Sequence, residues 1–315
     1  MALTNQMRMS GADWGVLLLL SAIWGASFLF IEIAVETTAP FSLVAIRLAL
    51  AALALWGVLL IRRERLDLPP GAPFAFLILA LLTNVVPFIL FAYAQREITG
   101  SLGAILNATT PIWGVIVAHI ALADEKATPA KIAGVILGFG GVAAMIGPDF
   151  LSEVGTSVPA QLACLAATLC YALSGVYARR FKPMGVRPIS VATGQLSAGA
   201  LVMIPLVLLF EPPWATPGPS TGAWAALICL ALLCTSFAYI LYFRLVASAG
   251  ATNSLLVTFL IPVSAILLGA IFLGERLEPR HVLGLALIAA GLAAIDGRLL
   301  RRLRPPAPTE ACPES

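Results

Sequence analysis

Two charged side chains lie inside long apolar runs of this sequence, where they could take part in chemistry. Glu32 is near the end of the run 13–35, and Arg47 is early in the run 41–61. A carboxyl group in such a setting can take up a proton or bind an ammonium group, and a guanidinium can hold a carboxylate in a bidentate fork. The alternative is a structural ion pair, or two side chains that reach separately for interfacial water.

At about 1.5 Å of helix per residue, Glu32 and Arg47 would lie at depths of roughly 9 and 13 Å, so that the two side chains could meet. Neutral polar and aromatic side chains in other apolar runs could line the same site, although hydrogen bonds between helices are the ordinary use of such groups in membranes. The candidates are Trp24, Ser27, Asn84, Asn107, Tyr171, Ser174, Gln195, Tyr239 and Asn253.

Two prolines interrupt apolar runs at near-equivalent places in the two halves of the chain. Pro111 and Pro262 each free a backbone carbonyl group, which then needs another hydrogen-bond partner. We therefore predict helix breaks at both positions, used for bending or for a binding site.

The composition requires that these residues be positioned by membrane-spanning helices. The chain has 60% hydrophobic and 11% charged residues and a mean hydropathy of +0.97, which leaves too little polar surface for a water-soluble globule. One span takes about 20 apolar residues. The expected spans are 13–35, 41–61, 72–94, 101–122, 130–147, 158–179, 189–210, 222–243, 251–272 and 281–300.

The two halves of the chain repeat each other at a fixed spacing. Six pairs of matching residues lie 150 positions apart: Gly100 and Gly250, Glu125 and Glu275, Lys126 and Arg276, Pro129 and Pro279, Gly134 and Gly284, and Gly141 and Gly291. Nearer the start of each half the offset is 148, which aligns Arg47 with Gln195. Because five spans per repeat is an odd number, the second copy must cross the membrane in the opposite sense. Inverted repeats are typical of secondary transporters that work by alternating access.

The fold class is therefore an all-α integral membrane protein, with ten transmembrane helices as two inverted five-helix repeats. We expect a tail at 1–12, the first repeat at 13–148, the second at 149–300 and a polar, disordered tail at 301–315. With the N-terminus inside, 15 of the 19 Lys and Arg residues fall on the cytoplasmic side. The prediction is a multi-pass protein of the bacterial inner membrane with both termini in the cytoplasm.

The sequence offers little for catalysis or for cofactors. Its two histidines, His119 and His281, lie in different spans without metal-ligand spacing, and no phosphate-binding or nucleophile-elbow motif is present. The net charge of +3 is explained by the ends of the spans and the tail. We expect no enzyme activity, cofactor, metal or nucleic-acid partner, and duplication within the chain makes a monomer sufficient.

Several short motifs, in this order, resemble the EamA-type transporters of the drug/metabolite transporter superfamily. They are Trp24-Gly25-Ala26-Ser27-Phe28, Pro40 followed by Arg47, Asn107 with Pro111, Gly274-Glu275-Arg276, and Gly284 with Ala290-Gly291. The resemblance implies a ten-helix inner-membrane carrier with a cavity lined by spans one to four and six to nine. Family members are commonly exporters of amino acids or related metabolites. Glu32 stands where many relatives carry a basic residue.

The resulting hypothesis is an exporter of small metabolites, with amino acids or their derivatives as the first candidates. It would work by alternating access, driven by proton antiport or by the substrate gradient. One alternative is efflux of cationic or lipophilic toxic compounds, favoured if Glu32 faces the cavity without Arg47 as a partner. An alternative of another class is a membrane scaffold or sensor without turnover, which a closed, dry centre would favour.

Overall fold

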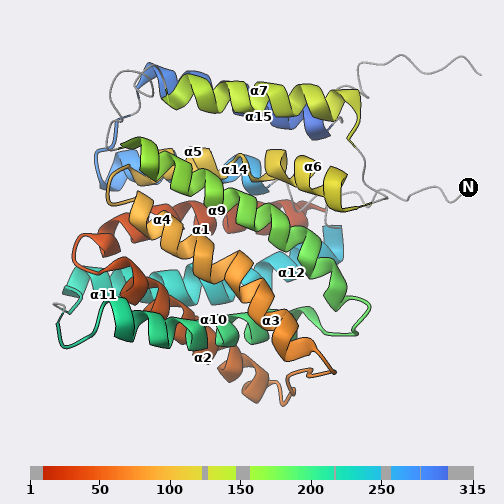
Figure 1. The fold of residues 1–315 in the computed structure, drawn as a ribbon, viewed down its shortest axis with the longest axis vertical. Coiled ribbons are helices and arrows are strands. Elements are labelled where there is room, and N and C mark those ends of the chain that lie inside the picture. Colours follow the sequence, from red (N-terminus) through yellow and green to blue (C-terminus); the bar gives the residue numbers. More distant parts are fainter. Residues whose placement is uncertain are drawn as a thin grey trace, which may run out of the picture.

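The computed structural model describes residues 10–122, 127–146, 157–215, 218–249, 257–276 and 278–296. All regular elements in these ranges are helices, packed into one bundle (Figure 1). The first repeat holds α1 (Gly11–Val35), α2 (Pro40–Ile61), α3 (Ala72–Ala80), α4 (Val86–Ala94), α5 (Gly100–Asn107), α6 (Thr110–Ala121) and α7 (Pro129–Ile146). The second holds α9 (Ser157–Ala178), α10 (Pro188–Phe210), α11 (Thr221–Ile228), α12 (Ala238–Ala249), α14 (Val257–Phe272) and α15 (Pro279–Asp296).

Seven helical segments are long and apolar enough to cross a membrane, with boundaries close to the predicted spans. They are Gly11–Val35, Pro40–Ile61, Ala72–Ala94, Gly100–Ala121, Val158–Phe181, Pro188–Phe210 and Thr221–Val246. The other three predicted spans correspond to α7, α14 and α15, of which α7 and α14 contain shorter apolar helices, so the full count of ten stays a prediction. Residues 123–126, between the fourth and fifth predicted spans, lie outside the described residues, as do both predicted tails apart from residues 10–12.

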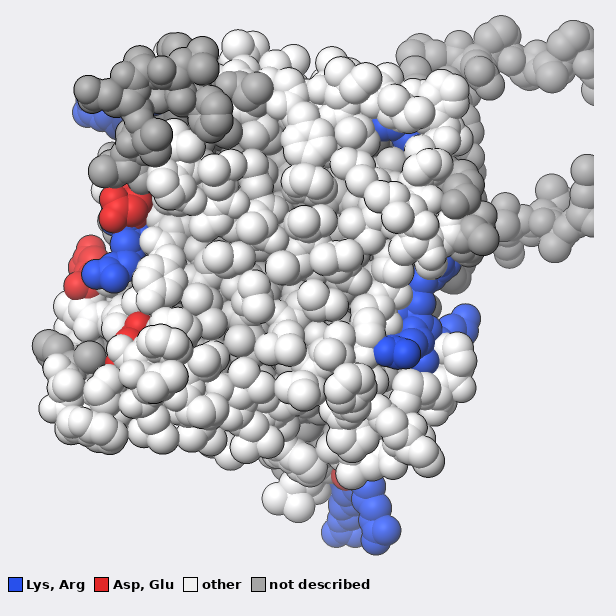
Figure 2. Space-filling view, in the orientation of Figure 1, with Lys and Arg blue, Asp and Glu red and all other residues white. Residues whose placement is uncertain are grey.

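The surface of the bundle is that of a protein surrounded by lipid. Large apolar side chains such as Leu60 and Ile61 are 79% and 84% exposed on the outside of the helices. In the space-filling view, charged side chains lie at the two ends of the helices with an uncharged belt between them (Figure 2). A contiguous apolar surface of this extent would cause aggregation in water but is stable in hydrocarbon.

Corresponding helices of the two repeats run in opposite directions. The colours in Figure 1 show that α1 and α9 are antiparallel, and so are α2 and α10. The contacts are symmetric too, because α2 packs on its counterpart α10 and α7 on its counterpart α15, while α1 packs on α14 as α9 packs on α5 and α6. This is the arrangement that two repeats of opposite orientation produce around a pseudo-two-fold axis.

The glycines repeated at 150 positions hold α7 and α15 together. A Cβ atom added at Gly141 would lie 2.7 Å from the carbonyl oxygen of Gly284, and one at Gly291 would lie 2.5 Å from that of Gly134. The two backbones therefore touch at equivalent points in each repeat, which only residues without a side chain allow. The faces of α7 and α15 that carry these glycines form a packing surface.

Both repeats contain a widened, π-helical segment in their third span. It covers Leu81–Val85 between α3 and α4, and Cys229–Phe237 between α11 and α12. The two segments begin 148 positions apart, which is the offset of the repeats in this part of the chain. In the first, Pro87 follows and has no N–H group to bond the carbonyl of Thr83. In the second, the hydroxyls of Thr235 and Ser236 bond carbonyl groups five residues earlier. Such segments often occur at functional sites.

Pro111 and Pro262 differ in their effect on the helices. The fourth span is interrupted between α5 and α6, directly before Pro111, and the hydroxyl of Thr110 donates to the carbonyl of Asn107 across the gap at 2.8 Å. Pro262 lies inside α14, which continues through it to Phe272.

Candidate functional site

A cavity of about 300 Å³ lies in the centre of the bundle, between the two repeats. Its walls come from α1, α2, the third span, and α5 and α6 of the first repeat, and from α9, α12, the second π-helical segment and α14 of the second repeat. Among the residues that the structure describes, α10 contributes none to the lining, although the seventh span was expected there. The site therefore depends on the packing of both halves.

Arg47 is the charged group of this cavity. Its side chain is 5% exposed, its Nε donates to the hydroxyl oxygen of Thr235 at 3.0 Å, and its guanidinium carbon lies 3.8 Å from the centre of the Phe88 ring. None of the acidic side chains in the described ranges forms an ion pair with it. A hydroxyl and a ring face only partly replace the hydration that burial removes from a guanidinium.

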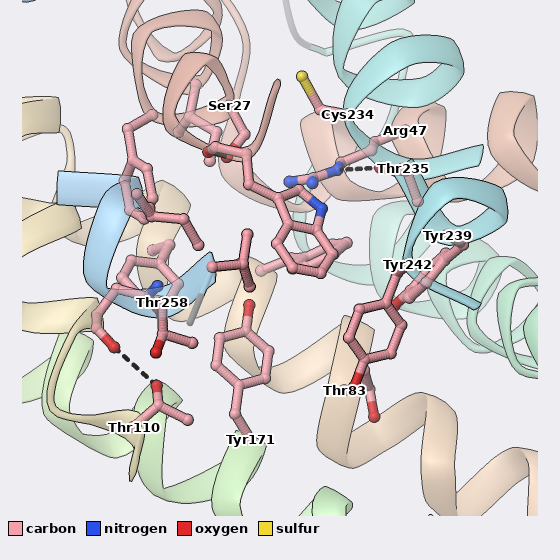
Figure 3. Close-up of a pocket in the computed structure, with 18 residues that line it drawn as sticks. Ser27, Arg47, Thr83, Thr110, Tyr171, Cys234, Thr235, Tyr239, Tyr242 and Thr258 are labelled. Carbon is pink, nitrogen blue, oxygen red and sulfur yellow. Dashed lines mark hydrogen bonds between the residues drawn. The ribbon is translucent and has the colours of Figure 1, made fainter. Parts of the chain in front are cut away.

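Thr235 holds the guanidinium in place because its own hydrogen bonds are fixed. Its hydroxyl donates to the carbonyl oxygen of Leu230 at 2.7 Å, so a lone pair of the oxygen remains to accept the Nε–H of Arg47. The terminal nitrogens of Arg47 have no hydrogen-bond partner among the described residues. These nitrogens and the hydroxyl of Tyr171 both point into the cavity (Figure 3). Two N–H groups in a rigid plane are thereby presented to a ligand.

The rest of the wall is largely aromatic. The rings of Trp24 and Tyr242 lie 5.6 Å apart, those of Phe28 and Phe91 5.5 Å, and those of Phe91 and Tyr171 6.2 Å. Rings at these separations pack well against each other and against a planar or aliphatic ligand. A mainly apolar cavity with a few polar anchors is the usual form of a small-molecule site.

Apart from Glu32, the predicted site residues fall into three groups. Those that line the cavity are Trp24, Ser27, Arg47, Asn107, Tyr171 and Tyr239. Those that lie behind the wall, where they are buried, are Asn84, whose Oδ1 accepts a 3.1 Å hydrogen bond from Tyr239, together with Ser174 and Gln195. Asn253 lies outside the described residues. Whether any of them contacts a substrate stays a prediction.

Glu32 lies outside the cavity and has a different set of partners from Arg47. Its Oε2 accepts the backbone N–H of Gly100 at 2.5 Å, while the carboxylate of Glu275 accepts that of Ser101 at 3.2 Å. Both carboxylates therefore sit on the first turn of α5, where the backbone N–H groups have no partner within the helix. In this structure Glu32 is a cap that joins α1 to α5.

Several lining residues were not among the predicted ones, notably Thr83, Cys234, Thr235 and Thr258. The two π-helical segments place the first three of them. The signal available in the sequence was the pair of segments at an offset of 148, one followed by Pro87 and the other carrying adjacent hydroxyl residues. No group of three or more His, Cys, Asp or Glu side chains that could bind a metal occurs in the described part of the chain.

Comparison with known proteins identifies the family. The model of the EamA-like transporter family matches the chain twice, over residues 13–147 and 158–295. The chain belongs to the EamA-like transporter family. This transporter is embedded in the membrane, and nothing in the family or in the site points to catalysis.

Relatives of this EamA-like transporter are also named as transporters. The Bacillus subtilis protein named uncharacterized transporter YoaV is 23% identical over 86% of this chain and 91% of its own length. The Escherichia coli protein named uncharacterized inner membrane transporter YedA is 27% identical over 93% of each. A probable terminal-alkyne amino-acid exporter of Streptantibioticus cattleyicolor is 27% identical over 95% and 97%. A solved crystal structure shares the fold, with a TM-score of 0.66 and 20% identity over 94% of this chain and all of that one.

Proposed function

We propose that this protein exports small amphipathic metabolites across the bacterial inner membrane, with amino acids or their derivatives as the first candidates. The observation that carries the proposal is the buried guanidinium of Arg47, which faces an aromatic cavity without an acidic partner among the described residues. A charge so placed is costly unless a ligand neutralises it for part of the cycle. The relative named as an amino-acid exporter supports the same class of substrate.

The arrangement of the repeats supports alternating access as the mechanism. The cavity lies where two repeats of opposite orientation meet, so that rocking one against the other would open it first to one face and then to the other. Proton antiport or the substrate gradient would drive the cycle. The substrate, the lipid bilayer and protons are then the only partners that the proposal requires, and a monomer suffices.

The two alternative functions, efflux of cations and a scaffold or sensor, predict different properties of the cavity. Efflux of cationic compounds was favoured if Glu32 faced the cavity without Arg47, but Arg47 lines it and Glu32 caps α5 outside it. A scaffold or sensor without turnover would be favoured by a closed, dry centre. The lining of this cavity includes hydroxyl groups, an amide and a guanidinium, and these polar groups favour transport.

Counterflow in proteoliposomes tests the proposal. Vesicles loaded with each of a panel of unlabelled amino acids and derivatives should accumulate the labelled form of at least one class, and Arg47→Ala should abolish that exchange. Glu32→Gln should retain it, because Gln keeps an oxygen that accepts the Gly100 N–H. Exchange that persists in Arg47→Ala would remove this cavity as the transport site, and absence of exchange across the whole panel would favour cationic compounds or a role without transport.

A further inference from the structure

The charge on the described lining of the cavity is of one sign, which is positive. Arg47 supplies a full positive charge, and no Asp or Glu is present among the lining residues that the structure describes. The segment 250–256, between α12 and α14, contains no acidic residue in its sequence. The remaining polar lining consists of neutral groups: Ser27, Thr83, Asn107, Thr110, Tyr171, Thr235, Tyr239, Tyr242 and Thr258.

The carboxylates of Glu32 and Glu275 already have hydrogen-bond partners outside the cavity. Glu32 and Glu275 accept the first N–H groups of α5, and neither belongs to the lining of the cavity. An ammonium group bound beside Arg47 would therefore meet dipoles of hydroxyl groups but no opposite charge. It would also lie within a few ångströms of a guanidinium in a setting of low dielectric constant, where repulsion is poorly screened.

The net charge of the loaded cavity then distinguishes three kinds of ligand that share one carbon skeleton. A monoanion neutralises Arg47, so that the loaded cavity carries no net charge. A zwitterion places its carboxylate on Arg47 but leaves the cavity with the net charge that it had when empty. A cation raises that charge further. Burial in an apolar site favours the first case and opposes the last.

We propose that this cavity selects organic monoanions, that is, carboxylates with an aromatic or similarly apolar body and without a charged amine, over zwitterionic amino acids. The carboxylate binds the two terminal nitrogens of Arg47, which the hydrogen bond to Thr235 and the ring of Phe88 hold in one orientation. The apolar body packs among the rings of Trp24, Tyr171 and Tyr242. This selection rests on the proposed function and narrows it to derivatives whose amino group is absent or neutral.

Three ligands with the same phenylethyl skeleton test the charge selection on the wild-type protein. They are 3-phenylpropanoate, phenylalanine and phenethylamine, which are an anion, a zwitterion and a cation at pH 7. Binding is measured by titration calorimetry on the full chain in detergent, since the uncharged form of a weak acid crosses bilayers unaided. The anion should bind about tenfold more tightly than phenylalanine or better, which corresponds to at least about 1.4 kcal/mol, and phenethylamine should not saturate.

Variants of Arg47 show whether the preference comes from this side chain. Arg47→Gln should remove the advantage of the anion over phenylalanine, whereas Arg47→Lys should keep the order of affinities with weaker binding of the anion, because an ammonium lacks the bidentate fork. Arg96→Gln is the control, because Arg96 is an exposed cation outside the cavity and its loss should change none of the three affinities. The order of the three ligand affinities can be measured on the wild-type protein even if a variant fails to fold.

The outcomes distinguish failure of the charge selection alone from failure of both proposals. If phenylalanine binds as tightly as the anion, or more tightly, and Arg47→Gln abolishes its binding, the selection for monoanions is wrong while a transport site at Arg47 remains. If none of the three ligands binds the wild type, both the selection and the assignment of this cavity to small amphipathic metabolites fail. Tightest binding of phenethylamine would overturn both and favour efflux of cations.

Discussion

At the scale of single residues, the charged side chains of Glu32 and Arg47 have separate tasks. Arg47 faces the cavity, and Glu32 caps α5 together with Glu275. The difference arises from what each group meets, because a carboxylate is stabilised by the free N–H groups of a helix N-terminus whereas a guanidinium is not. Residue-scale predictions therefore differ for binding and for stability.

Thr235→Val should weaken binding of an anionic substrate without preventing folding. Valine has the shape of threonine but no hydroxyl, so Arg47 loses its 3.0 Å acceptor and its guanidinium becomes free to turn. Loss of one such bond is worth about 1 kcal/mol, or a several-fold rise in Kd measured by calorimetry. Ser197→Ala is the matched control, since the Ser197 hydroxyl bonds Trp56 and lies outside the cavity. Equal affinities in wild type and Thr235→Val would show that this bond does not position Arg47.

Glu32→Ala should lower stability and leave substrate affinity nearly unchanged. Removal of the carboxylate leaves the N–H of Gly100 without its acceptor, and loss of a helix cap costs about 1 kcal/mol. The expected result is a lower Tm in detergent, with Glu32→Gln closer to wild type. A large loss of affinity at unchanged Tm would instead place Glu32 in the binding site.

At the scale of elements, the structure depends on pairs of helices that correspond between the repeats. The contact of α7 with α15 uses the same glycines twice, once from each side, and the π-helical segments in the third spans recur at an offset of 148. Duplication of the repeat thus explains why the same helix packing occurs in both halves of the chain. The cavity itself is less symmetric, because Arg47 corresponds to Gln195, which is buried in α10 behind the wall.

Gly141→Ala should destabilise the protein, and Gly140→Ala should not. A methyl group at Gly141 would meet the carbonyl oxygen of Gly284 at 2.7 Å, while at Gly140 nothing lies within 4 Å. Overpacking of this kind costs about 1–3 kcal/mol, whereas Ala at an open helical position is neutral or slightly stabilising. Thermal melts of the two variants in the same detergent compare them directly. Similar Tm values would mean that α7 and α15 separate without cost.

At the scale of the whole molecule, the repeats are also joined at one end of the bundle by an ion-pair network. Arg187, at the start of α10, bonds Asp67 and Glu64 of the loop after α2 at 2.9 and 2.5 Å. The distribution of Lys and Arg predicts that this end faces the cytoplasm. Hydrogen bonds from the side chain and the backbone N–H of Arg187 lower the pKa of Asp67 to about 2.

The sign of this shift sets the pH dependence of the network. Because the pKa of Asp67 is lower in the folded state, its contribution to stability is complete above its ordinary pKa near 3.9 and is lost as the pH falls toward about 2. Asp67→Asn should therefore lower the Tm at pH 7 and at pH 5, and the difference should shrink at pH 3. The loss at pH 7 should be less than about 1 kcal/mol, since the side chain of Arg187 is 43% exposed. A difference that grows on acidification would contradict this assignment.

Reporter fusions test the orientation of the whole molecule. The distribution of Lys and Arg predicts that both termini are cytoplasmic. A C-terminal green fluorescent protein should therefore fluoresce in cells, and a C-terminal alkaline phosphatase should be inactive. A fusion after residue 215, in the loop before α11, should give the opposite pair of results. An active phosphatase at the C-terminus would show that the topology is the reverse of the predicted one.

The sequence by itself determined the class of protein and its internal repeat. Apolar runs of about 20 residues specify helices in a membrane through local composition alone, and matches at offsets of 148 and 150 are visible without any contact between the halves. For that reason the boundaries of seven spans and the membership of the family could be predicted.

Only the tertiary structure decided which polar groups share a site. Arg47 and Thr235 are 188 positions apart, and their contact depends on how α2 packs against the second π-helical segment. The depths of Glu32 and Arg47 along their helices allowed the two side chains to meet, but depth does not specify the direction in which a side chain points around its helix. That direction follows from the packing of both repeats, which turned Glu32 to the start of α5 and Arg47 to the cavity.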